Sequence, residues 1–149
     1  MLRLARAIET GEYSHEQLTE KTQQWIDKSE VFVSVKSLKY IARSGRVNPL
    51  KGFIGKLLNL KPIITVNREG KSELLEKSFT ENGSKQNLIA HVQKFAKNHK
   101  IWGYAITHAD SLKTANKYAN ELTDILKKEP EFKAEKGLGL ASTIASKML

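Results

Sequence analysis

The spacing of apolar residues changes repeatedly along the chain and predicts alternating helices and strands. Apolar side chains recur every three or four residues, the period of one helix face, over residues 2–9, 15–28, 37–43, 48 to about 60, 84–98 and 111 to about 127. Runs rich in β-branched and aromatic residues predict strands over 31–35, 62–66, 72–79 and 101–107, with an edge strand at 132–136. The small-residue and apolar run at 137–149 fits neither period. This alternation predicts an α/β fold with an α+β tendency, a mixed sheet with helices packed on it.

Capping and turn residues set the predicted ends of these elements. Gly11 ends the first helix, and Ser14 with Gln17 three residues later forms a capping box at the start of the second. The sequence "NREGK" (67–71) predicts a turn that joins two strands as an antiparallel pair. Gly45 is predicted to end another helix, and Pro130 to prevent the last helix from continuing beyond about Lys127. Other amino-terminal caps are predicted at Ser84 and at Asp110 or Ser111. The faces predicted to point inward carry Leu18, Trp25, Ile26, Leu38, Ile41, Leu88, Ile89, Val92, Phe95, Leu112, Ala115, Ala119, Leu122 and Leu126.

Length and composition limit the class of protein. The chain has 149 residues, which predicts one domain over residues 1–149 or a compact pair of subdomains. It contains no cysteine, which excludes disulfides and thiolate metal sites and fits a reducing compartment. Arg3, Arg6 and Glu9 interrupt the segment in which a signal peptide needs an unbroken apolar core, and no apolar run approaches the roughly 18 residues that span a bilayer. We therefore expect a cytoplasmic protein with no transmembrane segment.

The chain is strongly basic, with 25 Lys and Arg against 16 Asp and Glu, and a net charge of +9. This excess suits nucleic acid, anionic lipid, phosphorylated ligands or an acidic protein partner. The lysines are scattered over predicted helix surfaces, which favours solvated charges with a local subset that meets an anion. No recognisable nucleic-acid-binding motif and no cluster of aromatic residues accompanies them, so we expect no nucleic acid partner and keep a basic nucleic-acid-binding module as a minor alternative.

The motifs of common enzymes are missing. The sequence has no Gly-rich phosphate loop followed by Lys and Ser or Thr, no G-x-G-x-x-G and no G-x-S-x-G elbow, and "GLGLAS" (137–142) lacks the lysine of a phosphate loop. The four histidines include no pair with metal-ligand spacing on one helix. We therefore expect no catalysis, no metal and no cofactor. His108 differs from the other histidines because it stands where a buried strand meets a helix amino terminus, a position at which α/β sheets bind ligands.

These features occur in an order that resembles the second half of the DegV family. The segment "SLKYIARSGRV" precedes an apolar helix, followed by "KPIITVNREGK", a helix, and a strand that ends in "AITHAD" before another helix; the resemblance covers roughly residues 1–135. It implies a bacterial lipid-binding protein that binds a long-chain fatty acid and presents its carboxylate to the kinase subunit of fatty acid kinase. It also implies a single DegV-like C-terminal domain, since the 149 residues contain no counterpart of the family's first lobe.

The resemblance, together with the chemistry of the side chains, assigns candidate binding residues. Guanidinium groups bind a carboxylate or acyl phosphate in a bidentate manner, and glycine lets the backbone approach closely, so the site for the headgroup or the partner comprises Arg43, Ser44, Gly45, Arg46 and His108. Since each buried methylene contributes about 0.8 kcal/mol, the acyl-chain pocket comprises Phe53, Ile54, Leu57, Leu58, Ile63 and Ile64. The same apolar residues also suit an ordinary core, and either arginine also suits helix capping or an ion pair with Glu.

An alternative to lipid binding is a structural half-protein that pairs with a separately encoded first-lobe chain and has no ligand of its own. A homodimer is the other expected assembly, because the face that a first lobe would cover is predicted to be apolar and exposed apolar patches bind partners. The family also ends in a turn that contains Gly and His near the headgroup, whereas this chain ends in "GLGLASTIASKML" without a histidine.

Overall fold

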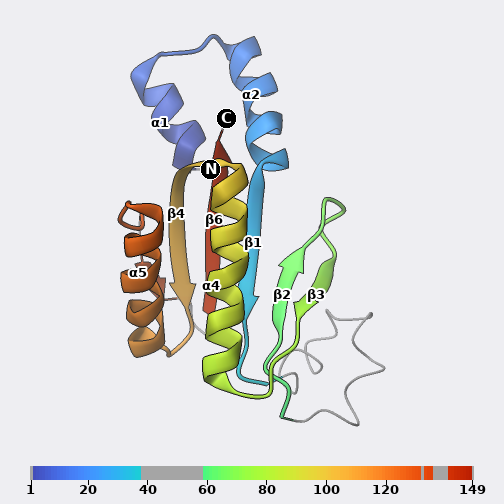
Figure 1. Cartoon of the computed structure of the whole chain (residues 1–149). Coiled ribbons are helices and arrows are strands. Elements are labelled where there is room, and N and C mark those ends of the chain that lie inside the picture. Colours follow the sequence, from blue (N-terminus) through green and yellow to red (C-terminus); the bar gives the residue numbers. More distant parts are fainter. Residues whose placement is uncertain (1, 38–58, 132, 136–140, 149) are drawn as a thin grey trace.

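The computed structural model describes residues 2–37, 59–131, 133–135 and 141–148. They form a mixed sheet with helices packed on it, which confirms the predicted fold class (Figure 1). The elements are α1 (Leu2–Thr10), α2 (His15–Asp27), β1 (Ser29–Ser34), β2 (Ile63–Val66), β3 (Ser72–Glu76), α4 (Glu81–Asn98), β4 (Lys100–His108), α5 (Leu112–Leu126), β5 (Lys133–Glu135) and β6 (Ala141–Met148). The helix predicted over 37–43 and most of the helix predicted from 48 to about 60 lie outside the described residues.

The six strands of the described chain form one sheet in the order β3-β2-β1-β6-β4-β5. Strand β6 occupies a central place and pairs antiparallel with β1 on one side, from Ser29 opposite Ser146 to Ser34 opposite Ala141, and with β4 on the other. Strands β1 and β4 are therefore parallel to each other, and both end at the lower edge of the sheet in Figure 1. Strand β5 pairs parallel with β4 and confirms the edge strand predicted near residue 133.

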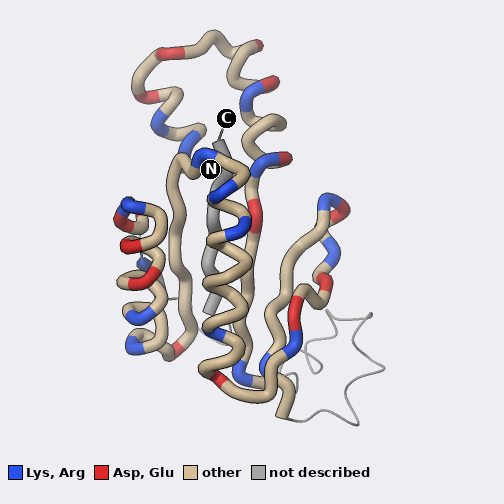
Figure 2. Tube along the Cα trace, in the orientation of Figure 1, with Lys and Arg blue, Asp and Glu red and all other residues tan. Residues whose placement is uncertain are grey.

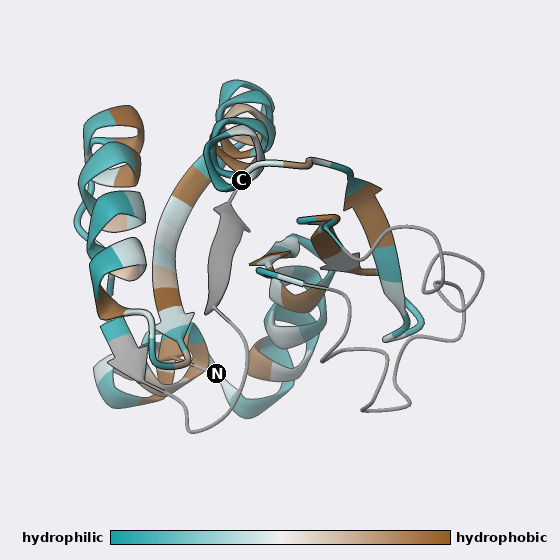
Figure 3. Cartoon of the chain, turned by 90° about the horizontal axis from the view of Figure 1, so that it is seen from below, coloured by the Kyte–Doolittle hydropathy of each residue, from teal (hydrophilic) through white to brown (hydrophobic). Residues whose placement is uncertain are grey.

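Helices α4 and α5 cover one face of the sheet, and the core lies beneath them (Figure 1). Viewed from below, the helices surround a curved sheet and present largely hydrophilic outer sides (Figure 3). The buried cluster consists of Phe32, Ile63, Tyr104 and Ile106 from the sheet, Leu88, Ile89 and Val92 from α4, and Ala115, Tyr118, Ala119 and Leu122 from α5. Fully burying one large aliphatic side chain contributes about 1.5–3 kcal/mol, so this cluster fixes both helices on the sheet.

Local signals near the start of the chain act as the sequence predicts. Gly11 has a φ of +63°, a left-handed conformation that glycine adopts without strain, and α1 ends just before it. The hydroxyl of Ser14 accepts a hydrogen bond from the backbone N–H of Gln17 at 3.4 Å, and the Gln17 side chain accepts one from the Ser14 N–H at 2.9 Å. The predicted capping box is thus confirmed.

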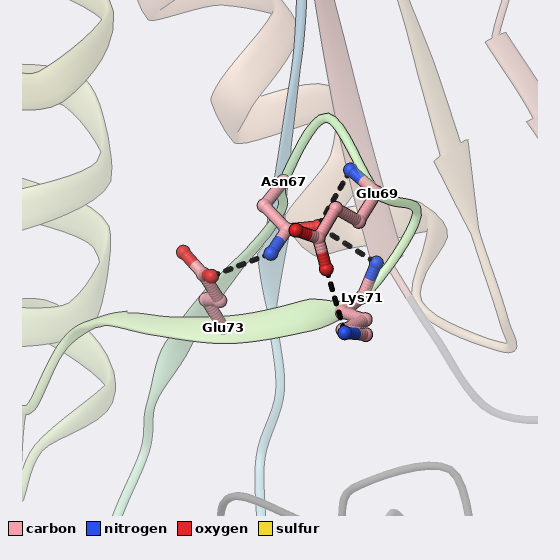
Figure 4. Close-up of polar contacts among 4 residues, drawn as sticks. All are labelled: Asn67, Glu69, Lys71 and Glu73. Carbon is pink, nitrogen blue, oxygen red and sulfur yellow. Dashed lines mark hydrogen bonds and ion pairs between the residues drawn. The ribbon is translucent and has the colours of Figure 1, made fainter.

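The predicted turn between β2 and β3 is also confirmed, and Asn67 organises it (Figure 4). Its side-chain oxygen accepts hydrogen bonds from the backbone N–H groups of Glu69 at 3.0 Å and Lys71 at 2.9 Å, while its amide donates to Glu73 at 2.6 Å. Gly70 completes the turn with a φ of +76°. Asparagine bonds of this kind hold a short loop without help from neighbouring elements.

The structure corrects the predicted cap of α4. The helix begins at Glu81, and the hydroxyl of Thr80 caps it by accepting a hydrogen bond from the Gly83 N–H at 3.0 Å. Ser84 therefore lies inside the helix and is 2% exposed. Thr80 and Ser84 both carry a hydroxyl that can cap a helix, so the sequence pattern does not distinguish a helix that begins after Thr80 from one that begins a turn later.

Two residues predicted to face the core are exposed. Ile26 is 60% exposed because α2 lies at the end of the sheet and, among its own residues, buries only Trp25 (Figure 1). Leu112 is 57% exposed because it is the first residue of α5, at the lower edge of the sheet. Helix α5 ends at Leu126, close to its predicted end near Lys127, which adopts a left-handed conformation (φ +53°).

Candidate functional site

A cleft opens at the edge of the sheet where α4 and α5 begin. Figure 1 shows that β1 and β4 end at this same edge. Because β1 and β4 are parallel, the fold brings both strand ends and both helix starts to the same place. The cleft has a volume of about 290 Å³, and we call it the edge cleft. Its lining consists of Ser34, Val35 and Lys36 after β1, Lys61 before β2, Glu81, Asn82, Ser84 and Lys85 in α4, and Ser111, Thr114, Lys117 and Tyr118 at the start of α5.

Three of the hydroxyl groups that line the edge cleft lie close together. The hydroxyls of Ser34 and Ser84 lie 3.2 Å apart and share a hydrogen bond between β1 and α4. Tyr118 is 4% exposed, and burial is the main cause that raises the pKa of its phenol, while a hydrogen bond with Ser34 and the nearby Lys85 ammonium act in the opposite direction. The phenol therefore remains protonated at neutral pH. These bonds fix three hydroxyl groups from three elements at one place.

Lysines line the cleft around these hydroxyls. Figure 2 shows basic positions at this lower edge and also around the upper end of the molecule. The Lys85 ammonium forms an ion pair with Glu121, and the Lys61 ammonium donates a hydrogen bond to the backbone carbonyl of Lys36 at 3.0 Å. No carboxylate of the described ranges lies within ion-pair distance of Lys36, Lys61 or Lys117. The edge cleft thus carries cationic charge that the described part of the chain does not neutralise, and it suits an anion.

Helix α5 starts beside the edge cleft without a side-chain cap. Ser111 occupies the N-cap position but its side chain bonds none of the first N–H groups of the helix. Its own backbone N–H donates to Nδ1 of His108 at 3.4 Å. Asp110, between them, has a φ of +46°, which is unusual for a residue other than glycine. The connection from β4 to α5 is therefore held by His108, while the first turn of the helix keeps donors available.

His108 is the only predicted headgroup residue among the described ranges, and it does not line the edge cleft. It is the last residue of β4 and is 3% exposed, so the ring lies beneath the surface. Its bond with Ser111 shows that the imidazole supports the loop before α5. Arg43, Ser44, Gly45 and Arg46 lie outside the described residues.

The predicted acyl-chain pocket is described only at Ile63 and Ile64, since Phe53, Ile54, Leu57 and Leu58 lie outside the described residues. Ile63 is 0% exposed and belongs to the core cluster beneath α4. Ile64 is 4% exposed, lies opposite Val33 of β1 and does not belong to that cluster. The two neighbouring isoleucines therefore contribute to different packing surfaces, as successive residues of a strand do.

The residues of the edge cleft were not predicted from the sequence. Its lysines come from separate elements, so no linear motif joins them, and the usable signal was limited to hydroxyl and basic residues that follow a strand or begin a helix. In the part of the chain that the structure describes, no group of three or more His, Asp or Glu residues is placed to hold a metal ion. No helix in the described ranges is long and apolar enough to cross a membrane.

A mixed sheet with a polar cleft at the ends of its parallel strands is the architecture of an α/β ligand-binding domain. The family model described as "Uncharacterised protein, DegV family" matches residues 1–142. This chain therefore belongs to the DegV family.

Individual relatives match this chain over part of their own length. A DegV domain-containing protein of Staphylococcus aureus (strain N315) is 29% identical over 104 residues, which are 70% of this chain and 37% of that protein. The crystal structure of a fatty acid binding DegV family protein from Streptococcus agalactiae is 24% identical, with a TM-score of 0.82 over 98% of this chain and 54% of that chain. The Streptococcus pneumoniae fatty acid kinase (Fak) B3 protein, loaded with linoleic acid, is 17% identical, with a TM-score of 0.77 over 97% of this chain and 53% of that chain. The chain thus spans about half the length of these solved structures.

Proposed function

We propose that this chain binds a long-chain fatty acid and presents its carboxylate to the kinase subunit of a fatty acid kinase, without catalysing a reaction itself. The observation that carries the proposal is membership of the DegV family, in which the S. agalactiae relative is described as fatty acid binding. The S. pneumoniae relative is described as a fatty acid kinase B3 protein that contains linoleic acid. A fold shared over 98% and 97% of this chain supports the same role here.

We assign the carboxylate to Arg43, Ser44, Gly45 and Arg46. The segment 38–58 that contains them joins the described chain at Ser37 and Asn59. Lys36 and Lys61, close to these two junctions, both line the edge cleft. A charge-assisted contact between a guanidinium and a carboxylate contributes about 1.5–3 kcal/mol, so the loss of one arginine is expected to be measurable.

The acyl chain is assigned to the apolar residues Phe53, Ile54, Leu57, Leu58, Ile63 and Ile64. Of the two isoleucines in β2, Ile64 fits this role better, because it is buried outside the cluster beneath α4, whereas Ile63 is already part of that cluster. We also infer that the chain is a single domain equivalent to the second half of its longer relatives. It is therefore expected to bind fatty acid weakly alone and more tightly with a chain equivalent to the first lobe.

Calorimetry with oleate or palmitate on delipidated protein tests lipid binding, first with the chain alone and then with a first-lobe partner. Tight, saturable one-to-one binding by the chain alone would contradict the expectation that a first-lobe chain completes the lipid site. No binding in either state would contradict the proposed function. Acyl-phosphate formation with a reconstituted kinase subunit tests the headgroup site. Arg46→Ala is expected to lower it about tenfold or more, with partial recovery in Arg46→Lys, because a lysine supplies charge without the planar fork.

Arg68→Ala is the matched control for Arg46→Ala, because it removes the same kind of side chain from an exposed position in the turn between β2 and β3, away from the edge cleft. It is expected to leave acyl-phosphate formation unchanged. An equal loss in both variants would indicate a general effect of positive charge, and it would remove the assignment of Arg46 to the headgroup.

A further inference from the structure

We propose that the edge cleft binds a phosphate group carried by a small molecule. The proposal depends on described residues alone and stands whether or not the chain binds fatty acid. Its first support is charge. Lys36, Lys61, Lys85 and Lys117 line the cleft together with a single carboxylate, that of Glu81.

The number of cations fits phosphate better than carboxylate. A phosphate monoester carries about −1.5 to −2 charges at pH 7 and three acceptor oxygens, whereas a carboxylate carries one charge. Among the described residues, Lys36, Lys61 and Lys117 have no carboxylate within ion-pair distance, although they converge on one cleft from the end of β1, the start of β2 and α5. A dianion between them would neutralise charges that otherwise repel one another.

The donors in the cleft also fit phosphate, and they favour the side formed by α5. The hydroxyls of Ser111 and Thr114 line the cleft next to a first turn that has no side-chain cap. Helix α4 differs, because Thr80 caps its first turn and Glu81 places a negative charge there. Helix amino termini attract anions only where their N–H groups are free, so the phosphate is expected closer to Thr114 and Lys117 than to Glu81.

The size and rigidity of the cleft restrict the ligand to a small molecule. Its volume of about 290 Å³ is near the lower end of ligand pockets, which measure about 300–1,000 Å³. The hydrogen bond between Ser34 and Ser84 and the burial of Tyr118 hold the hydroxyls in place before a ligand arrives. Prearranged donors bind more tightly because less conformational freedom is lost on binding.

The site is tested by titrating the delipidated chain with inorganic phosphate and recording the backbone amide signals by NMR. Chloride keeps the ionic strength constant and serves as the reference anion. The amide chemical shifts of Ser34, Ser84 and Thr114 are expected to change with added phosphate until they reach a plateau. The double variant Lys36→Gln/Lys117→Gln is expected to bind about tenfold more weakly, the loss of two partly exposed charge contacts. The control Lys94→Gln/Lys97→Gln removes the same charge from the far end of α4 and is expected to change affinity less than about twofold.

Two further variants separate a defined site from general attraction. Thr114→Val removes a hydroxyl without changing charge and is expected to weaken binding roughly threefold, and Glu81→Gln is expected to strengthen it by a similar factor. Acetyl phosphate and ADP, titrated in the same way, distinguish an acyl phosphate from a nucleotide as the carrier, and the preferred carrier must displace inorganic phosphate. Shifts that do not saturate, equal weakening in both lysine double variants, or carriers that bind without displacing phosphate would overturn the proposal.

Discussion

Replacing Leu122 with alanine tests the placement of α5, the helix that forms one wall of the edge cleft. Leu122 is 0% exposed and packs in the cluster beneath α4 and α5, whereas Leu112, in the same helix, is 57% exposed. The apolar period of the sequence predicts both side chains on the inward face. The apolar pattern thus predicts similar effects of Leu→Ala at the two positions, whereas the structure predicts a large effect at Leu122 and a small one at Leu112.

The expected magnitudes differ widely. Deleting a fully buried leucine side chain to the β-carbon removes its transfer free energy and leaves a cavity, so Leu122→Ala is expected to lower the free energy of unfolding by about 2–5 kcal/mol. Leu112→Ala is expected to change it by less than about 0.5 kcal/mol. Since 1 kcal/mol shifts the melting temperature of a chain of this size by about 2–4 °C, the first variant is expected to melt roughly 5–15 °C lower and the second within about 2 °C of the parent.

Urea unfolding followed by tryptophan fluorescence gives the free energies, and circular dichroism gives the melting temperatures. If the two substitutions lowered the free energy of unfolding equally, or Leu112→Ala lowered it more, the placement of α5 would be refuted, because the helix would then bury a different face. Such a result would also remove Thr114, Lys117 and Tyr118 from the wall of the edge cleft, since they share that helix.

Further predictions concern ionisation, capping and backbone conformation. Burial raises the pKa of Tyr118 above the ordinary phenol value of about 10, so its contribution to stability is present below that pH and is lost at higher pH. The free energy of unfolding in urea is therefore expected to fall less between pH 8 and pH 11 in Tyr118→Phe than in the parent. Thr80→Ala removes the acceptor for the Gly83 N–H and is expected to cost about 0.5–2 kcal/mol in urea unfolding, while Thr80→Ser retains most of the stability. Gly11→Ala places a β-carbon in a left-handed conformation with no atom within 4 Å, so strain alone is expected to cost about 1 kcal/mol, and the urea midpoint should recover in Gly11→Asn.

The elements that the sequence predicted correctly are those specified by residues close together in the chain. Ser14 and Gln17 cap α2 through bonds that span three residues, and Asn67 organises a turn through bonds to residues two and four positions later. Such bonds form in any fold that lets the segment adopt its local conformation. The same physics explains why β2 and β3 could be predicted as an antiparallel pair.

Long-range partners decided the elements that the sequence did not predict. Ser84 and Thr80 both suit a helix cap, and Ser84 became a buried helix residue whose hydroxyl bonds Ser34, 50 positions away in the chain. The run at 137–149 fitted no period, yet residues 141–148 form β6, the strand between β1 and β4. Its position follows from pairing with strands distant in sequence, which a local pattern does not record.

The edge cleft depends on that same strand. Because β6 pairs antiparallel with both β1 and β4, these two strands point the same way, and the chain must start α4 and α5 at the edge where they end. Lys36, Lys85 and Lys117 reach one cleft only through this arrangement, since each follows or belongs to a different element. Four of the 25 basic residues, which lie far apart in the sequence, thus line one cleft. Composition alone therefore indicated an anionic partner, and the topology of the sheet determines where on the described chain such a partner is expected to bind.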